Sequence, residues 1–106
     1  MKKRKANIPL TVENNLKILG KHINQARLRR KFTMAMVAER ADISCPTLCK
    51  VEKGESGVAM GAYANVLFCL GLDDNFSLLA GNDPLGRRLQ DAELTYTKRR
   101  PPKRSK

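Results

Sequence analysis

The chain has 106 residues, of which 42% are apolar, 5% are aromatic and none is Trp, so we expect one domain with a small aliphatic core. Its formal net charge of +11 favours a polyanionic partner, although ten of its 21 basic residues lie in the first five and last nine positions. No run approaches the ~18 apolar residues needed to cross a membrane, and the basic N-terminus lacks the apolar segment of a signal peptide, so we expect a cytoplasmic protein.

Helical signals organise the first part of the chain. Residues 1–10 form a basic arm that we expect to be flexible. Apolar residues at steps of three and four then predict an amphipathic helix over residues 11–30. Thr33 is placed to cap a second helix over residues 34–41, which Asp42 ends.

The next helix has signals at both ends. Ser44 is a candidate N-cap, and Pro46 fits the first turn, where its missing N–H costs nothing. The helix is predicted to run to about Lys53, because Gly54 supplies the conformationally permissive residue that often follows a helix.

The second half of the chain is predicted to contain shorter helices. Apolar residues predict a fourth helix over residues 60–70, and a short fifth helix is expected around residues 76–80. Pro84 is expected to start one further turn. We therefore expect four segments: a flexible arm at 1–10, a main domain at 11–81, a C-terminal extension at 82–97 that is a candidate dimer or partner contact, and a disordered basic tail at 98–106.

The second and third predicted helices have the spacing of a helix-turn-helix. The small side chain of Ala38 lets the two helices approach closely, and three residues of turn separate helices that cross steeply. Asp42 stands at the turn position that Gly usually holds, and Asp tolerates the left-handed conformation better than most residues. The inward-facing positions are predicted to be Val37, Ala38, Ala41, Ile43, Leu48 and Val51. The pattern predicts an all-α fold.

Four motifs, A-R-x-x-R, V-A-E-R-A, S-x-P-T-L and V-E-K-G, follow one another between Ala26 and Gly54. With them, residues 12–72 resemble the helix-turn-helix domain of the xenobiotic-response-element (XRE) family, which includes phage repressors of the lambda and Cro type. The resemblance implies a compact five-helix lambda-repressor-like domain, associated with the nucleoid, that binds a palindromic operator in double-stranded DNA as a homodimer. It also implies a partly buried ion pair between Arg27 and Glu52 that ties the first helix to the third.

A second likeness concerns the C-terminal part. The stretch DPLGRRLQDAEL with its basic tail resembles the small HipB-like antitoxins that accompany HipA-type kinases. It implies an antitoxin that represses its own operon and binds a toxin kinase. Two alternatives remain: a stand-alone or phage-type regulator, and a protein-interaction module that no longer reads DNA. No nucleophile, base and orienting group occur at catalytic spacing, so the chain is not predicted to be an enzyme.

The DNA-reading side of the third helix is predicted from geometry. The N-terminal half of a recognition helix faces base edges, while helix starts hold phosphates. Lys50 can donate to guanine, and Thr47 can contact a thymine methyl group. Many relatives in the family have Gln at the position of Met34, and Met cannot replace its phosphate contact well. The predicted DNA-binding residues are Thr33, Met34, Ser44, Cys45, Pro46, Thr47, Cys49, Lys50 and Lys53, with Arg29, Arg30, Lys31 and Arg40 as phosphate candidates.

The charge differs between the two halves of the domain. Residues 12–60 contain nine basic and five acidic residues, whereas residues 61–97 contain two basic and five acidic ones. The first half therefore suits a phosphate backbone better than the second. The apolar and acidic segment from Leu70 to Leu85 is the predicted dimer surface.

The three cysteines are an odd number, which cannot form a closed set of disulfides and favours a reducing compartment. Cys45 and Cys49 are four residues apart and share a helical face. Zinc needs about four ligands, whereas the only His is His22 and Cys69 lies on a helix expected in the core, so no metal or cofactor is predicted. A redox switch is an alternative, because a thiol near a helix N-terminus beside Lys50 can have a lowered pKa. The favoured interpretation is that both cysteines serve as small semi-apolar residues against DNA.

Overall fold

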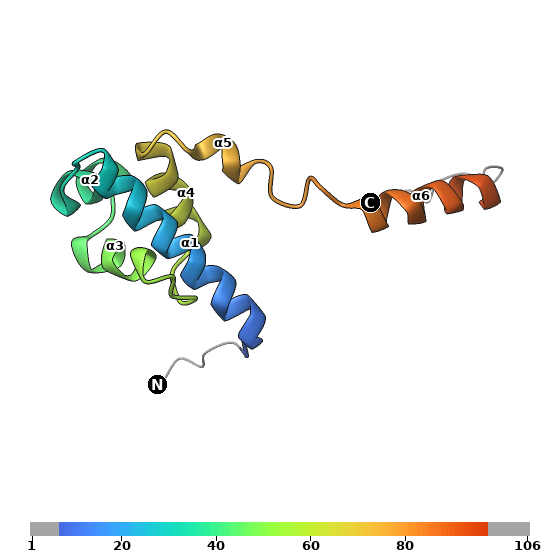
Figure 1. Ribbon diagram of the computed structural model, residues 1–106, viewed down its shortest axis with the longest axis horizontal. Helices are drawn as coiled ribbons and strands as arrows, with labels where there is room; N and C mark the ends of the chain where they lie inside the picture. The colour runs from blue at the N-terminus through green and yellow to red at the C-terminus, as the bar shows by residue number, and fades with distance from the viewer. Residues whose placement is uncertain (1–6, 98–106) are drawn as a thin grey trace.

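The structure, a computed structural model, describes residues 7–97, and the regular structure in that range is entirely helical (Figure 1). Its helices are α1 (Leu10–Arg29), α2 (Met34–Ala41), α3 (Cys45–Glu52), α4 (Met60–Cys69), α5 (Asp73–Phe76) and α6 (Pro84–Thr97). None of them is long and apolar enough to span a membrane. The predicted all-α class is confirmed for the described residues. Residues 1–6 of the predicted arm and the whole predicted tail at 98–106 lie outside the described range.

The first four predicted helices agree with the structure to within one residue at each end. Helix α1 begins at Leu10, the last residue of the predicted arm, and its C-cap is Arg30. The local signals between α2 and α3 also act as predicted. The Thr33 hydroxyl accepts a hydrogen bond from the Met36 N–H, and the Ser44 hydroxyl accepts one from the Thr47 N–H.

Asp42 ends α2 in the left-handed conformation, with φ 59° and ψ 45°. Gly54, just after α3, has φ 71°. Both residues were predicted to hold these turns. Because the left-handed conformation reverses the chain within one residue, α2 and α3 are separated by only three residues.

The prediction for the fifth helix was wrong in position, although the main domain holds the predicted number of five helices, α1 to α5. Helix α5 covers Asp73–Phe76, where two carboxylates occupy the first turn and favour the positive end of a helix. Residues 77–81 instead form turns, and Ala80 has φ 66°, which no helix can contain.

The single turn predicted at Pro84 is in fact a helix of 14 residues. The Asp83 carboxylate accepts a hydrogen bond from the Gly86 N–H at 3.0 Å, and Pro84 occupies the first helical position. These two local signals start α6, so the described residues contain six helices.

The core lies where α1 to α4 meet. Close packing joins α1 to α3, α2 to both α3 and α4, and α4 to α5. The largest side chains with under 2% of their surface exposed are Ile23, Val37, Leu48, Val51 and Val66. Leu70 is also buried there, at 3% exposure, so the predicted dimer surface at 70–85 cannot include it. All six inward-facing positions predicted from the sequence are buried or half-buried.

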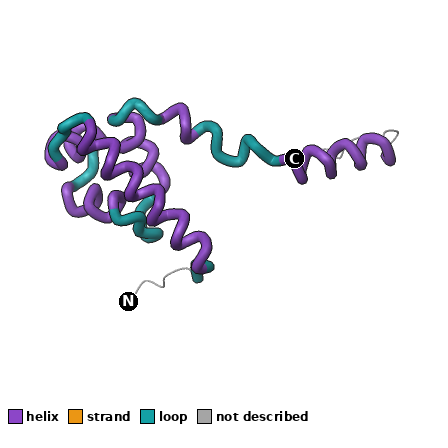
Figure 2. Tube along the Cα trace, in the orientation of Figure 1, coloured by secondary structure: helices purple, strands orange, loops and turns teal. Residues whose placement is uncertain are grey.

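Helix α6 is set apart from this bundle. Figure 1 shows it beyond an extended connection after α5, and Figure 2 shows that this connection is loop. Its leucines, Leu85, Leu89 and Leu94, are each more than half exposed.

Candidate nucleic-acid interface

Helix α3 has one face in the core and one face in solvent. Leu48 and Val51 are fully buried at 0% exposure, which fixes the rotation of the helix about its axis. Of the residues predicted to face outward, Cys45, Pro46, Lys50 and Lys53 are exposed. The structure therefore brings these four side chains to one solvent-facing surface, which we call the α3 outer face together with the half-buried Thr47 and Cys49.

The first turn of α3 is closed by its own side chains. The Ser44 hydroxyl accepts from the Thr47 N–H at 3.1 Å and donates to the Thr47 hydroxyl at 2.9 Å. This arrangement leaves the Thr47 hydroxyl hydrogen pointing away from Ser44 and able to donate elsewhere. Pro46 has no N–H, so this position in the first turn leaves no backbone donor to be satisfied.

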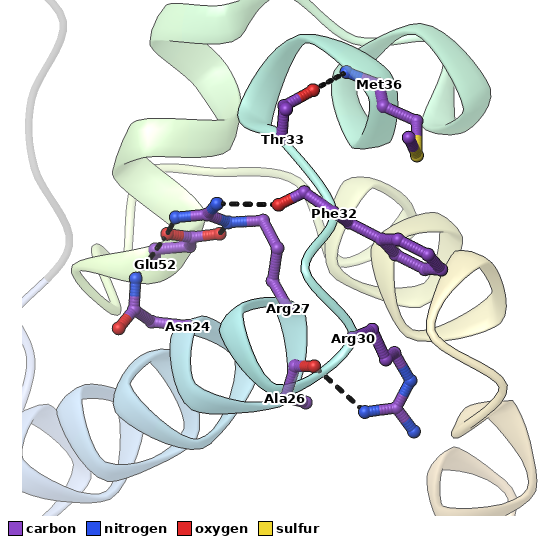
Figure 3. A network of polar contacts seen from close by, with 8 residues as sticks. All are labelled: Asn24, Ala26, Arg27, Arg30, Phe32, Thr33, Met36 and Glu52. Atoms are coloured by element: carbon purple, nitrogen blue, oxygen red, sulfur yellow. Dashed lines mark hydrogen bonds and ion pairs between the residues drawn. The ribbon is translucent and has the colours of Figure 1, made fainter.

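A buried ion pair joins the end of α3 to α1. The Arg27 Nε donates to Glu52 Oε2 at 2.6 Å and its second terminal nitrogen donates to Oε1 at 3.1 Å (Figure 3). The side chains of Arg27 and Glu52 are only 11% and 8% exposed. The predicted pair is confirmed, and its bidentate geometry fixes the orientation of both side chains.

Two partners of this ion pair were not predicted. The Asn24 side-chain amide donates to Glu52 Oε1 at 2.8 Å, and Arg27 also donates to the Phe32 carbonyl at 3.0 Å. The Phe32 carbonyl lies in the connection to α2, so one guanidinium ties α1 to two other segments of the chain, this connection and the end of α3. Gly20, Asn24 and Arg27 recur at steps of four and three on α1, and this spacing is the signal that could have placed Asn24 beside the pair.

A close backbone contact holds α1 against the end of α3. A Cβ atom placed on Gly20 would lie 2.5 Å from the Gly54 nitrogen and 2.8 Å from the carbonyl oxygens of Val51 and Glu52. Only a glycine permits this approach. The contact and the ion pair lie at the same end of α3, so that end is anchored twice.

The start of α2 differs from the outer face of α3. The hydroxyl of Thr33 is exposed but already accepts the capping hydrogen bond from Met36. Met34 is half-buried and packs against the core. Met34 therefore contributes packing at this position, and its side chain has no polar hydrogen to offer to a phosphate.

The predicted phosphate candidates on α1, on α2 and in the turn between them are all exposed. The Arg40 guanidinium lies 5.8 Å from the centre of the Phe32 ring, which holds it by a cation–π contact. Arg30 donates to the Ala26 carbonyl at the end of α1. Lys31 has φ 57°, so it takes the left-handed conformation that turns the chain between α1 and α2.

The three cysteines differ in exposure. Cys45 is exposed, whereas Cys49 and Cys69 are half-buried, and all three are free thiols. Burial raises the pKa of the Cys69 thiol, partly opposed by the positive charge of Arg40. Within residues 7–97, no group of three or more His, Cys, Asp or Glu side chains is arranged to hold a metal ion.

Comparisons of the chain with protein-family models, curated proteins and solved structures found no match.

Proposed function

We propose that the chain is a sequence-specific DNA-binding transcriptional repressor that reads double-stranded DNA with the α3 outer face. The observation that carries the proposal is the construction of α3: a capped helix with a fully buried inner face and an exposed face of small, apolar and basic side chains. The sequence spacing and the three-residue turn between α2 and α3 support a lambda-repressor-like helix-turn-helix, in which the second of the two helices enters the major groove.

Each side chain of the outer face has a contact that suits its chemistry. Lys50 can donate to O6 or N7 of guanine, and the Thr47 methyl group can pack on a thymine methyl group. Cys45 and Pro46 offer small apolar surface to the same groove. The exposed Lys53 and the basic side chains around the turn between α1 and α2 can neutralise phosphates.

The rigid attachment of α3 supports reading rather than loose electrostatic attraction. Base readout needs side chains held to within about half an ångström, and such precision comes from secondary structure anchored by packing and hydrogen bonds. Here α3 is fixed by Leu48 and Val51 on its inner face and by the Arg27–Glu52 pair at its end.

A selection from a pool of randomised duplexes, repeated with two variants, tests the proposal. Lys50→Ala is expected to weaken binding to the selected duplex by ~1–3 kcal/mol and to relax preference at one base position. Arg87→Ala removes the same charge from α6 and is the matched control, expected to keep both the affinity and the selected sequence. Equal behaviour of the two variants would contradict base reading by α3.

The same selection experiment gives a defined expected result for each alternative function. A protein-interaction module would enrich no duplex sequence at all. An antitoxin that represses its own operon would give the same result as any other repressor in this experiment. Its toxin-kinase partner is supported only by the resemblance of DPLGRRLQDAEL, and binding of that partner needs a separate test. The homodimer on a palindromic operator would give a selected sequence with two-fold symmetry.

A further inference from the structure

Helix α6 carries an apolar stripe that the bundle does not cover. Leu85 is 58% exposed, Leu89 is 60% exposed, and Ala92 is exposed as well. Successive steps of four and three place these residues on one face of the helix. An isolated helix of 14 residues is marginal in water, so a helix that keeps an apolar stripe in solvent gains stability from a partner.

The stripe has the spacing of a coiled-coil seam. In heptad notation, Leu85 falls at d, Leu89 at a and Ala92 at the next d. A strict a/d stripe is narrow, which suits one facing helix rather than a broad globular surface. Leu94 falls at f, on the opposite side from the seam.

The residues that flank the seam identify the facing helix. Arg88 falls at g, and Glu93 falls at the following e, five residues later. In a parallel pair of identical helices, each g residue faces the e residue of the following heptad on its partner. Each Arg88 would then face Glu93 of the other copy, twice in a two-fold pair. Two copies of α6 therefore have complementary charges when they lie parallel and in register.

We infer that α6 pairs in parallel and in register with α6 of a second copy of this chain. The seam is Leu85, Leu89 and Ala92, and it is flanked by Arg88 of each copy opposite Glu93 of the other. The pairing assigns the dimer contact to the predicted extension at 82–97 and leaves residues 70–84 outside the seam. Because the seam covers only two heptads, the dimer is weak and reversible in free solution.

The connection to α6 suits such a dimer. Residues 77–83 are seven residues of non-helical chain, which reach ~25 Å when extended. Two such connections allow both bundles to lie apart while their α6 helices remain paired. The dimer itself rests on α6 alone and does not depend on the proposed DNA binding.

Sedimentation equilibrium of the full chain without DNA, at near-physiological salt and up to high micromolar concentration, tests the inference. The chain is expected to show a reversible monomer–dimer equilibrium. Leu89→Asp is expected to raise the dimer dissociation constant roughly tenfold or more, because it places a carboxylate in the seam. Leu94→Asp changes an equally exposed leucine at f and is expected to leave the dissociation constant unchanged. Circular dichroism checks that both variants keep the helix content of the parent.

Charge reversal then tests the register. Arg88→Glu is expected to raise the dissociation constant roughly threefold or more, because it faces Glu93 of the other copy, and adding Glu93→Arg is expected to restore it. Arg87→Glu, at f, is the control and is expected to have little effect. A monomeric parent chain, equal effects of Leu89→Asp and Leu94→Asp, or no rescue by the double reversal would each overturn the parallel pairing.

Discussion

Arg27 is the residue on which the attachment of α3 depends most. Its guanidinium is almost fully buried, and it is satisfied by both Glu52 oxygens and by the Phe32 carbonyl. A buried cation is tolerable only while its partners remain, because stripping one partner leaves a charge without solvent or counter-charge. Asn24 adds a further hydrogen bond to the same carboxylate. Arg27 and Glu52 therefore stabilise the fold together, and neither side chain does so without the other.

Glu52→Ala is expected to lower the free energy of unfolding by ~3 kcal/mol, since it leaves Arg27 buried without its carboxylate. Urea denaturation followed by circular dichroism measures this loss. Glu39→Ala removes an exposed carboxylate from α2 and is the control, with an expected change of under ~0.5 kcal/mol. Equal losses in the two variants would mean that the ion pair contributes no more than a surface charge.

Tyr63 gives the protein a pH dependence at alkaline pH. Burial raises the pKa of its phenol, and the negative charge of Glu55 raises the pKa further. The neutral phenol donates to the Glu55 carbonyl at 2.7 Å, and ionisation removes this donor. Because the folded-state pKa lies above the unfolded value of about 10, the stability due to Tyr63 is complete below pH ~10 and is lost as pH rises further.

The comparison of the parent with Tyr63→Phe isolates this effect. The parent is expected to be more stable than the variant at pH 8 by ~1 kcal/mol, the usual net value of a hydrogen bond. The difference in free energy of unfolding is expected to shrink as pH rises above ~10. A difference that stays constant across this pH range would show that the phenol is not desolvated in the folded state.

At the scale of the elements, the crossing of α1 over the end of α3 is set by Gly20. Gly20→Ala is expected to destabilise the protein by ~1–3 kcal/mol, because the added Cβ meets backbone atoms of Val51, Glu52 and Gly54 that cannot rotate away. Urea denaturation measures the loss.

Gly61→Ala is the matched control within α4. A Cβ on Gly61 would have no neighbour within 4 Å, so this substitution is expected to stabilise by up to ~1 kcal/mol through helix propensity. Opposite signs for the two glycines support the close crossing, and stabilisation by both substitutions would contradict it.

The parts of the fold that sequence could predict are those with local causes. Thr33, Asp42, Ser44 and Gly54 act through hydrogen bonds or backbone angles within a few residues, and each has its predicted role. The Arg27–Glu52 pair was predictable because the family resemblance supplied a contact between distant residues. For the candidate site, the buried face of α3 followed from periodicity, which also gave its outer face.

The features that the sequence did not predict depend on which helices pack against each other, and local sequence patterns do not contain that information. The contact of Gly20 with the end of α3 depends on a helix crossing, which no local pattern records. Met34 was predicted as a DNA-binding residue, but its side chain packs against the core. Helix α6 had local signals in Asp83 and Pro84, but its leucines stay exposed among the described residues, so no tertiary contact predicted from the sequence called for a longer helix.

At the scale of the whole molecule, most of the excess positive charge comes from residues other than those of the α3 outer face. Ten of the 21 basic residues lie at the chain ends, and residues 6–97 carry nearly equal numbers of basic and acidic residues. Basic ends can hold any polyanion, with an affinity that falls steeply as salt rises. The α3 outer face, in contrast, is held in place by the bundle, and under the proposed function it is the surface that discriminates between base sequences.

The most direct test of the central proposal compares two duplexes: the one enriched from a randomised pool and a scrambled duplex of equal length. Fluorescence anisotropy gives both dissociation constants at low and at near-physiological salt. Binding to both duplexes is expected to weaken as salt rises, while the enriched duplex keeps its lower dissociation constant at the higher salt. Equal binding to both duplexes, collapsing together as salt rises, would contradict the proposal, because the basic segments would then account for all of the DNA binding.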